Sequence, residues 1–212
     1  MAYFLYGKKE IAYLKSKDIK LAAIIEQVGR IERAVDDDLF SSVIHHIIGQ
    51  QISTKAQQTI WAKLTTELGA ITPNTLLACG RERLQAFGTT WKKVDCMLDC
   101  AQKIQSGQFD IEALNTMTDE EAIAALSSLK GIGVWTAEMI LLFCLQRPDI
   151  CSYGDLAIQR GIRTVYRHKE LSRERFERYR KRFSPYCSIA SLYFWAVAGG
   201  AVPELTDPAA KK

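Results

Sequence analysis

The chain has 212 residues, of which 48% are hydrophobic and 25% are charged, and its formal net charge is +4. This composition is typical of a soluble globular protein, and no apolar run approaches the ~20 residues that a membrane span requires. The first residues also lack the pattern of a signal peptide. We therefore expect no membrane association and a cytoplasmic location, nucleoid-associated if the cell is bacterial.

Six cysteines are spread along the chain at spacings that match no zinc or iron–sulfur signature. Cys96 and Cys100 are four residues apart on an expected helix and could share a ligand face. Two thiols alone, however, do not complete a tetrahedral metal site. We expect reduced, mostly buried cysteines and no iron–sulfur cluster.

Helical periodicity dominates the first half of the chain. Gly49 ends a helix with two apolar rows, Ser53 is a candidate N-cap for the next helix, and Gly69 closes it. Thr72 begins a short helix with a proline at its first position, and a longer helix follows Gly88. The two apolar rows before Gly49 have the four-residue spacing of one helix face and consist of Leu39, Val43 and Ile47 beside Phe40, Ile44 and Ile48.

The second half continues the helical pattern. Thr118 and Glu121 fit a capping box, in which each side chain covers the other residue's backbone amide. A later helix is expected over residues 134–145, halted by Pro148, and Asp155 precedes another. Residues 149–153 are the one non-helical candidate nearby, and no alternating strand pattern occurs. The fold class is predicted to be all-α.

Residues 129–137 read LKGIGVWTA and place Gly131 and Gly133 between two expected helices. Glycine lets the backbone reach positive φ and lets another surface approach without an intervening Cβ atom. The amides of the turn and the open N-terminus of the second helix could hold a phosphate, because unpaired N–H groups and the helix dipole favour negative charge. A simple tight turn in a helical bundle explains the two glycines equally well.

Positive charge concentrates between Leu156 and Arg182, where ten Lys and Arg residues stand against three Glu residues. This local excess is larger than the net charge of the whole chain. Taken alone, it favours a solvated helix face with pairs such as Glu174 and Arg178 over a nucleic-acid surface.

Several segments together resemble a known family. LKGIGVWTAEMILLF is followed about twenty residues later by GDLAIQRGI, and this pair resembles the helix-hairpin-helix and downstream aspartate of the base-excision DNA glycosylase superfamily. IIGQQIS, GTTWKKVDCMLDCA and PYCSIASLYFW lie where its alkylated-base branch, the 3-methyladenine DNA glycosylase II type, has related segments. The resemblance covers most of residues 35–200.

The resemblance implies two helical lobes with a cleft between them. Residues 36–150 would form a lobe that ends in the helix-hairpin-helix, and residues 151–212 a C-terminal lobe that carries the catalytic aspartate. Residues 1–35 would pack with the C-terminal lobe. No accessory domain of the larger alkylation enzymes fits into those first residues, so we expect a compact catalytic core.

The resemblance also implies roles for individual side chains. Asp155 occupies the position of the catalytic aspartate, and Trp195 that of the indole that stacks on the flipped base. Trp135 stands where bifunctional relatives carry the lysine that breaks the strand, so it would shape the base pocket, and the enzyme would be monofunctional. Met139 stands where some relatives place a pocket tyrosine. Without the family, Asp155 is a helix N-cap and both tryptophans are core residues.

For DNA contacts, the resemblance implies a phosphate grip and a wedge. Lys130 and the hairpin amides of Gly131, Gly133 and Thr136 would hold the DNA backbone, and Gln51 would fill the gap left by the extruded nucleotide. No cofactor is expected. A structural Na or K ion could also lie in the hairpin, bound by the backbone carbonyls of Ser127, Leu129 and Ile132.

The implied function is a monofunctional, monomeric DNA N-glycosylase that flips out alkylated purines from duplex DNA and hydrolyses their N-glycosyl bond. Two alternatives stay open: a non-catalytic helix-hairpin-helix DNA-binding protein, and a glycosylase for a different damaged base. The chain also departs from the family pattern. Cys151-Ser152 replaces a common Phe-Pro before the aspartate, and Cys187 replaces a common arginine.

Overall fold

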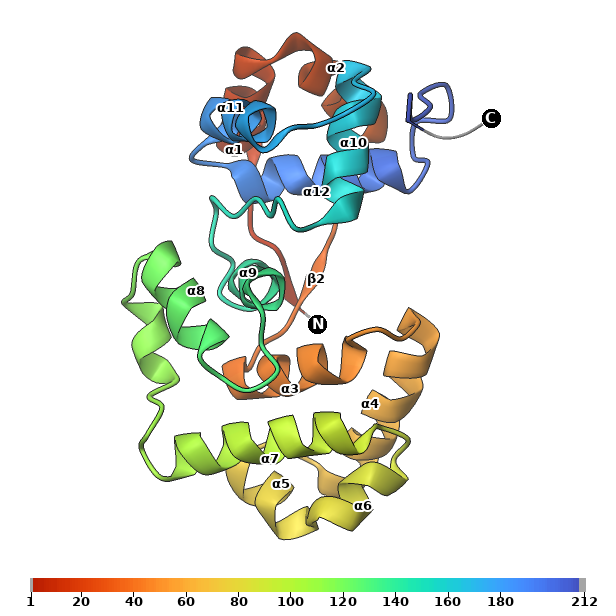
Figure 1. Cartoon of the computed structure of the whole chain (residues 1–212). Helices are drawn as coiled ribbons and strands as arrows, with labels where there is room; N and C mark the ends of the chain where they lie inside the picture. Colours follow the sequence, from red (N-terminus) through yellow and green to blue (C-terminus); the bar gives the residue numbers. More distant parts are fainter. Residues whose placement is uncertain (1, 210–212) are drawn as a thin grey trace. The chain divides into compact units, whose positions relative to one another are not determined.

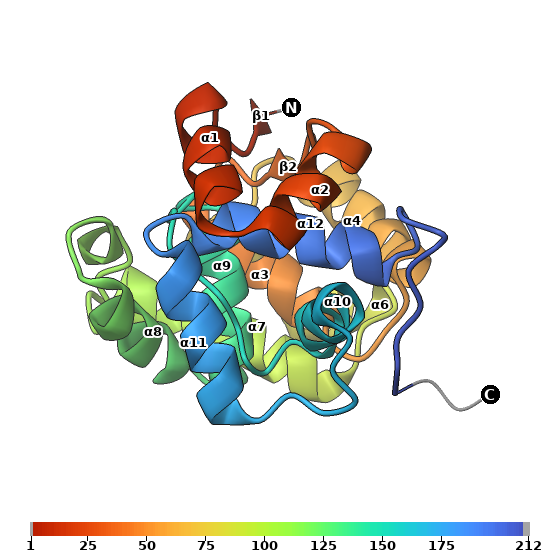
Figure 2. The same cartoon turned by 90° about the horizontal axis from the view of Figure 1, so that it is seen from above.

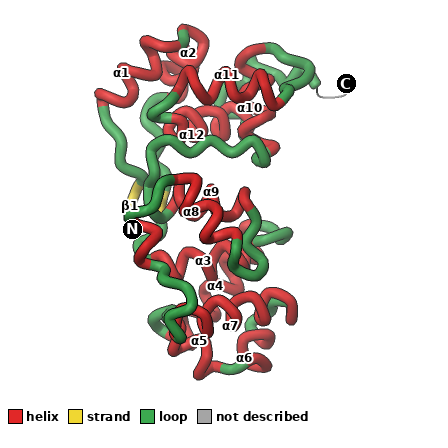
Figure 3. Tube along the Cα trace, turned by 60° about the vertical axis from the view of Figure 1, so that its left-hand side comes forward, coloured by secondary structure: helices red, strands yellow, loops and turns green. Residues whose placement is uncertain are grey.

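The computed structural model describes residues 2–209 of the chain. Twelve α-helices and one short 3-10 helix make up most of this part, and its two strands have two residues each (Figure 3). The predicted all-α class is therefore correct. Among the described residues, no helix is both long enough and apolar enough to cross a membrane.

The helices form two compact units. One comprises Met1–Val35 and Gln146–Lys212, of which residues 2–35 and 146–209 are described, and the other is Asp36–Leu145. We call the first the terminal unit, because it contains both ends of the chain, and the second the central unit. Each unit holds a different part of the predicted site.

The central unit is built around α3 and α7. Figure 1 shows α7 running alongside α3, and both α5 and α6 pack against α7. The core of this unit includes fully buried apolar residues from α3, α4, α5 and α6, such as Ile44, Leu64, Leu76 and Leu84. Its elements are α3 (Leu39–Gly49), α4 (Thr54–Leu68), α5 (Pro73–Cys79), α6 (Arg81–Ala86), α7 (Trp91–Gln105), the 3-10 helix η1 (Glu112–Asn115), α8 (Asp119–Ser127) and α9 (Val134–Phe143).

The terminal unit is built around α12, which packs against both α10 and α2 (Figure 2). Its two strands pair antiparallel, Ala2 with Val35 and Tyr3 with Ala34. The strands were not predicted, because two residues are too few for an alternating pattern. The elements are β1 (Ala2–Tyr3), α1 (Lys8–Lys17), α2 (Ile19–Val28), β2 (Ala34–Val35), α10 (Leu156–Tyr166), α11 (Arg173–Phe183) and α12 (Cys187–Ala198).

Side-chain caps fix where most helices begin. The Thr118 hydroxyl accepts from Glu121 N at 3.2 Å, and the Glu121 carboxylate accepts from Thr118 N at 2.9 Å, so the predicted capping box is confirmed. These bonds satisfy amides that the first turn of a helix leaves without an intrahelical acceptor. Side-chain caps also begin α2, α3, α4, α5, α7, α10 and α11, at Asp18, Asp38, Ser53, Thr72, Thr90, Asp155 and Ser172.

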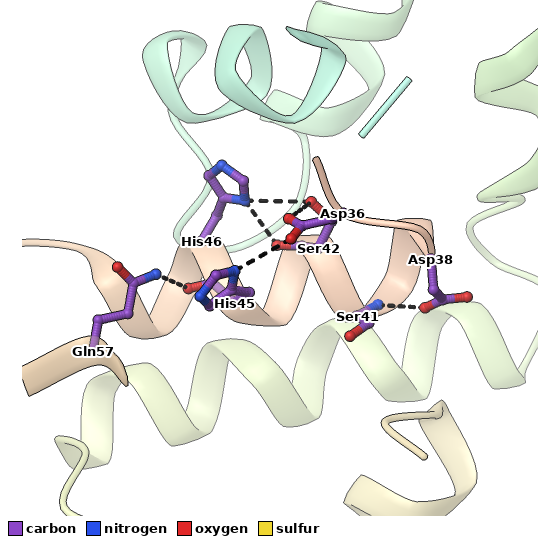
Figure 4. A network of polar contacts seen from close by, with 7 residues as sticks. All are labelled: Asp36, Asp38, Ser41, Ser42, His45, His46 and Gln57. Carbon is purple, nitrogen blue, oxygen red and sulfur yellow. Dashed lines mark hydrogen bonds and ion pairs between the residues drawn. The ribbon is translucent and has the colours of Figure 1, made fainter. Parts of the chain in front are cut away.

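A polar network surrounds Asp36 and the first half of α3 (Figure 4). Asp36 donates its backbone N–H to the Phe143 carbonyl at 2.8 Å, and its carboxylate accepts from the Ser42 hydroxyl at 2.7 Å. His45 Nδ1 lies 3.6 Å from the same carboxylate. Burial raises the pKa of Asp36, but the hydrogen bonds from His45 and Ser42 outweigh it, and the net pKa lies below the usual value.

Candidate functional site

The two glycines of the hairpin between α8 and α9 have different tasks. Gly131 has φ +84°, and a Cβ atom there would lie 2.7 Å from the Cys96 sulfur on α7. Gly133 has φ −94° and caps α9, and a Cβ atom there would meet nothing within 4 Å. The sequence expectation of positive φ therefore holds at Gly131, whereas Gly133 keeps the surface in front of α9 open.

The hairpin presents one polar and one apolar element to its surroundings. Lys130, Gly131 and Gly133 are exposed, and the first turn of α9 carries amides at the positive end of the helix dipole. Trp135 lies in the same turn and is 44% exposed. The arrangement can accept an anion at the amides and a flat apolar group at the indole.

The inner face of α9 is packed. Thr136 and Met139 are buried, as is Ile132 in the turn before the helix, and each has 5% or less of its surface exposed. The Ile132 N–H donates to the Leu129 carbonyl at 3.1 Å, which closes the turn. Thr136 is thus part of this packed face, and its hydroxyl lies 3.5 Å from the Gln50 side-chain amide.

The connection between α3 and α4, residues 50–53, is here called the wedge loop. Gln51 in this loop is exposed and has φ +56°, a conformation that residues other than glycine rarely adopt. Such backbone strain is often found at functional sites, where the surrounding structure enforces it. The wedge loop thus places the predicted wedge residue outward on a strained backbone.

Two residues that the sequence did not single out hold the wedge loop in place. The Gln50 side-chain amide donates to the Gly131 carbonyl at 2.8 Å and lies 3.5 Å from the Thr136 hydroxyl. The Lys93 ammonium donates to the Ile48 carbonyl at 2.8 Å and to the Gln50 carbonyl at 2.6 Å. The wedge loop is therefore bonded to both the hairpin and α7.

Asp155 begins α10 in the terminal unit. Its Oδ1 atom accepts hydrogen bonds from the backbone amides of Ala157 and Ile158, both at 2.9 Å. The residue is only 7% exposed. The expected N-cap role is confirmed, and the cap also fixes the direction of the carboxylate.

Trp195 reaches the same carboxylate from α12. Its indole N–H donates to Asp155 Oδ1 at 3.1 Å, and the residue is half-buried. Gly161 makes this approach possible, because a Cβ atom there would lie 2.2 Å from the Phe194 carbonyl of α12. The close packing of α10 and α12 brings together two predicted site residues that are 40 positions apart.

The two departures from the family pattern, Cys151-Ser152 and Cys187, both lie in the terminal unit. Ser152 is buried and its carbonyl accepts from the Asp155 N–H at 3.3 Å, which closes the loop that enters α10. Cys187 is buried and its thiol donates to the Arg180 carbonyl at 3.1 Å, and burial strongly raises its pKa. The thiol is thus a neutral packing group where the resemblance leads us to expect an arginine.

The basic stretch of α10 and α11 is partly neutralised within the terminal unit. Arg163 pairs with Asp207 at 2.7 Å, Arg173 pairs with Glu177 at 2.8 Å, and Arg182 pairs with Asp18. The pair between Glu174 and Arg178 expected from spacing does not form among the described residues; on α11, Glu177 instead pairs with Arg173 and lies 4.0 Å from Arg180. This supports the interpretation as a solvated face.

Within residues 2–209, no three His, Cys, Asp or Glu side chains lie close enough to hold a metal ion. All six cysteines are free thiols, and Cys96, Cys100 and Cys187 are buried. The Ser127 hydroxyl is buried without a hydrogen-bond partner in the described chain. Ser127 ends α8, next to the carbonyls that the resemblance assigns to a monovalent cation.

Comparison with known proteins gives consistent matches over most of the chain. The family model of the HhH-GPD superfamily of base excision DNA repair proteins matches residues 44–185. YfjP of Bacillus subtilis, which carries a DNA-3-methyladenine glycosylase name, is 26% identical over 82% of this chain. The chain spans 64% of that relative's length.

Two solved structures share the fold over nearly their whole length. A DNA-3-methyladenine glycosidase from Bacillus halodurans superposes with a TM-score of 0.84 at 30% identity, covering 96% of this chain and 95% of that one. The Schizosaccharomyces pombe 3-methyladenine DNA glycosylase, solved in complex with abasic DNA, superposes with a TM-score of 0.79 at 25% identity. That match covers 91% of this chain and 97% of the yeast chain.

Proposed function

Because the chain belongs to the HhH-GPD superfamily of base excision DNA repair proteins, we propose that it is a monofunctional DNA N-glycosylase. It removes alkylated purines of the 3-methyladenine type from duplex DNA and leaves an abasic site. The observation that carries this proposal is the contact between the Trp195 indole and the Asp155 carboxylate. The relatives named for 3-methyladenine, one of them bound to abasic DNA, support the substrate class.

Asp155 supplies the chemistry. Departure of the base leaves positive charge on the sugar, and a fixed carboxylate stabilises that charge in the transition state. At a separation of about 4 Å and an effective dielectric constant of about 20, two unit charges attract by about 4 kcal/mol. This corresponds to roughly a 10³-fold rate effect. Water then attacks the sugar, and the same carboxylate helps to orient it.

The two tryptophans determine which bases are excised and whether the DNA strand stays intact after excision. An alkylated purine that carries positive charge is attracted to the face of Trp195 by about 0.5–2 kcal/mol. Such a base is already a good leaving group and needs little help from a general acid. Trp135 has no amine, so it forms no Schiff base with the sugar and the DNA strand stays intact. Met139, behind Trp135 on α9, would contribute to the wall of the base pocket.

The central unit binds the DNA itself. The amides of Gly131, Gly133 and Thr136, with Lys130 beside them, hold a phosphate, and this contact carries no sequence preference. Gln51 enters the duplex from the wedge loop and fills the space left by the extruded nucleotide. Its exposure and strained φ support this role.

A Na or K ion bound by the carbonyls of Ser127, Leu129 and Ile132 would add a positive charge next to the phosphate. Carbonyl oxygens are suitable ligands for such hard cations. The buried Ser127 hydroxyl that lacks a partner in the described chain shows a polar group with spare hydrogen-bonding capacity there. DNA affinity measured in potassium chloride and in choline chloride at equal ionic strength tests the ion, since only a specific site distinguishes the two salts.

The substitution Asp155→Asn tests the proposed reaction. Asparagine keeps an acceptor for the two backbone amides, so α10 should still be capped, but the negative charge is lost. We expect release of 3-methyladenine from methylated duplex DNA to fall about 10³-fold with DNA binding retained. Asp38→Asn makes the same change at the cap of α3 and serves as the control. Unchanged release by Asp155→Asn would refute the catalytic assignment, and binding without release by the wild type would indicate a non-catalytic DNA-binding protein.

A further inference from the structure

Lys93 is a partly buried cation whose position the proposed reaction does not explain. It lies on α7 with both hydrogen bonds directed to carbonyls at the C-terminal end of α3, those of Ile48 and Gln50. Burial lowers its pKa. It forms no ion pair with any residue in the range 2–209. A cation is favourable at the negative end of a helix, but a solvent-exposed lysine would serve that purpose without being desolvated.

A chain of hydrogen bonds connects Lys93 to the hairpin through Gln50. Gln50, whose carbonyl accepts from Lys93, donates its side-chain amide to the Gly131 carbonyl at 2.8 Å. Cys96 lies one helical turn after Lys93 on α7, and its sulfur would lie 2.7 Å from a Cβ atom at Gly131. One face of α7 therefore supports both the wedge loop and the hairpin.

The residue supported most directly is Gln51. It follows Gln50 in the chain, and its φ of +56° is a costly conformation that the neighbouring contacts must enforce. The bonds from Lys93 fix the carbonyl just before it, and the Gln50 amide bond fixes that peptide against the hairpin. Without Lys93 the C-terminus of α3 would lose the two hydrogen bonds that the ammonium donates to it, and the backbone at Gln51 would be free to relax.

We propose that Lys93, acting through Gln50, is a positioning residue. It fixes the distance between Gln51 and the hairpin amides that bind the phosphate. This inference rests on the proposed function. A grip on the backbone and a wedge in the base stack act on one duplex at once, so their separation must match the DNA. A misplacement of about 1 Å in such an arrangement reduces the rate about 10²-fold.

The proposal predicts a loss that depends on whether a partner base is present. A wedge helps to displace a nucleotide that is paired and stacked. Where the opposite position lacks a base, there is no base pair to break, so the wedge contributes less to the rate. If Lys93 only capped α3, its removal would lower activity on both kinds of DNA equally. The comparison between the two DNAs therefore separates positioning from stability.

The experiment measures single-turnover release of 3-methyladenine by the full chain from two duplexes. In one duplex the lesion faces thymine, and in the other it faces an abasic site. Lys93→Met keeps the length of the side chain but removes its donors. Lys92→Met, at the exposed neighbouring lysine, is the matched control. Lys93→Arg restores a cation with several donors.

We expect Lys93→Met to lose about 10- to 100-fold on the duplex with thymine and less than about 3-fold on the duplex with the abasic site. Lys92→Met should match the wild type on both, and Lys93→Arg should recover most of the loss. Gln50→Leu should reproduce the selective loss of Lys93→Met, because it removes the bond to Gly131 and leaves Lys93 in place. This second variant keeps the test valid if Lys93→Met folds poorly.

Equal losses on the two duplexes, or no loss on either, would overturn the positioning role. These outcomes differ from failure of the proposed function, in which the wild type itself would release no base from either duplex.

Discussion

The two hairpin glycines offer a matched pair of substitutions whose effects should separate folding from DNA binding. Gly131→Ala forces an L-residue to φ +84° and puts a Cβ atom 2.7 Å from the sulfur and 3.2 Å from the Cβ atom of Cys96. The left-handed backbone costs about 1–2 kcal/mol, and overpacking against the buried Cys96 side chain costs about 1–3 kcal/mol. We expect a destabilisation of about 3 kcal/mol, or about 6–12 °C in Tm for a chain of this length.

Gly133→Ala should behave differently. Its φ of −94° is open to any residue, and the added Cβ atom meets nothing within 4 Å. Alanine is a poorer N-cap than glycine, so we expect the free energy of unfolding to fall by less than about 1 kcal/mol. The new methyl group would stand where the phosphate approaches the amides of α9, and affinity for duplex DNA should fall about 10-fold.

Thermal unfolding and fluorescence anisotropy with a short duplex measure the two effects. The double substitution Gly131→Ala with Cys96→Ala removes the 2.7 Å clash with the sulfur but keeps the 3.2 Å approach to the Cβ atom of residue 96 and the backbone cost, so it should recover part of the lost stability. Equal Tm values for Gly131→Ala and Gly133→Ala would refute the account of the turn. Undiminished DNA binding by Gly133→Ala would refute the phosphate grip.

Three further predictions concern other parts of the site. Trp195→Phe keeps an aromatic ring but removes the indole N–H that donates to Asp155. A hydrogen bond to a charged group contributes about 1.5–3 kcal/mol, so the rate of single-turnover excision should fall about 10- to 150-fold. An unchanged rate would contradict a role for that bond. Because Trp135 has no amine, borohydride should trap no covalent complex with DNA, and a trapped adduct would contradict monofunctionality. Since the pKa of Asp36 is lowered in the folded state, its contribution to stability is present above its usual pKa and is lost as pH falls through the lowered value. Asp36→Asn should therefore flatten the loss of stability in acid, as urea unfolding at pH 7 and pH 3 would show.

Local signals in the sequence predicted the helix starts well. The caps at Ser53, Thr118 and Asp155 were each predicted and confirmed, because a cap and the amides it binds lie within three residues of each other. The resemblance to the glycosylase superfamily was also correct, since the family model matches residues 44–185. The caps and the family motifs are each carried by short segments, in which the residues that matter are close together in the chain.

Backbone conformation was predicted less well. The sequence indicated that the hairpin glycines provide positive φ and an open approach for another surface, but not which glycine does which; Gly131 has the positive φ, and Gly133 leaves the space. Helix α9 was expected to reach Leu145 and ends at Phe143. Pro148 marks where a helix cannot continue, but it does not fix the last turn.

Contacts between distant segments could not be predicted from the residues alone. Lys93 and Gln50 are 43 positions apart, and Gln50 and Gly131 are 81 positions apart. Gly161 carried a weak signal, because a glycine inside a helix costs stability and usually has a packing reason. That reason is the Phe194 carbonyl of α12. Only the folded chain shows which partner such a residue has.

The most direct test of the account is to incubate the full chain with duplex DNA that carries methylated purines and to identify the released bases by mass spectrometry. We predict free 3-methyladenine in the soluble fraction, and DNA strands that stay intact until alkali or heat cleaves the abasic sites. Salt-dependent DNA binding without any released base, or strands broken without alkali, would contradict it.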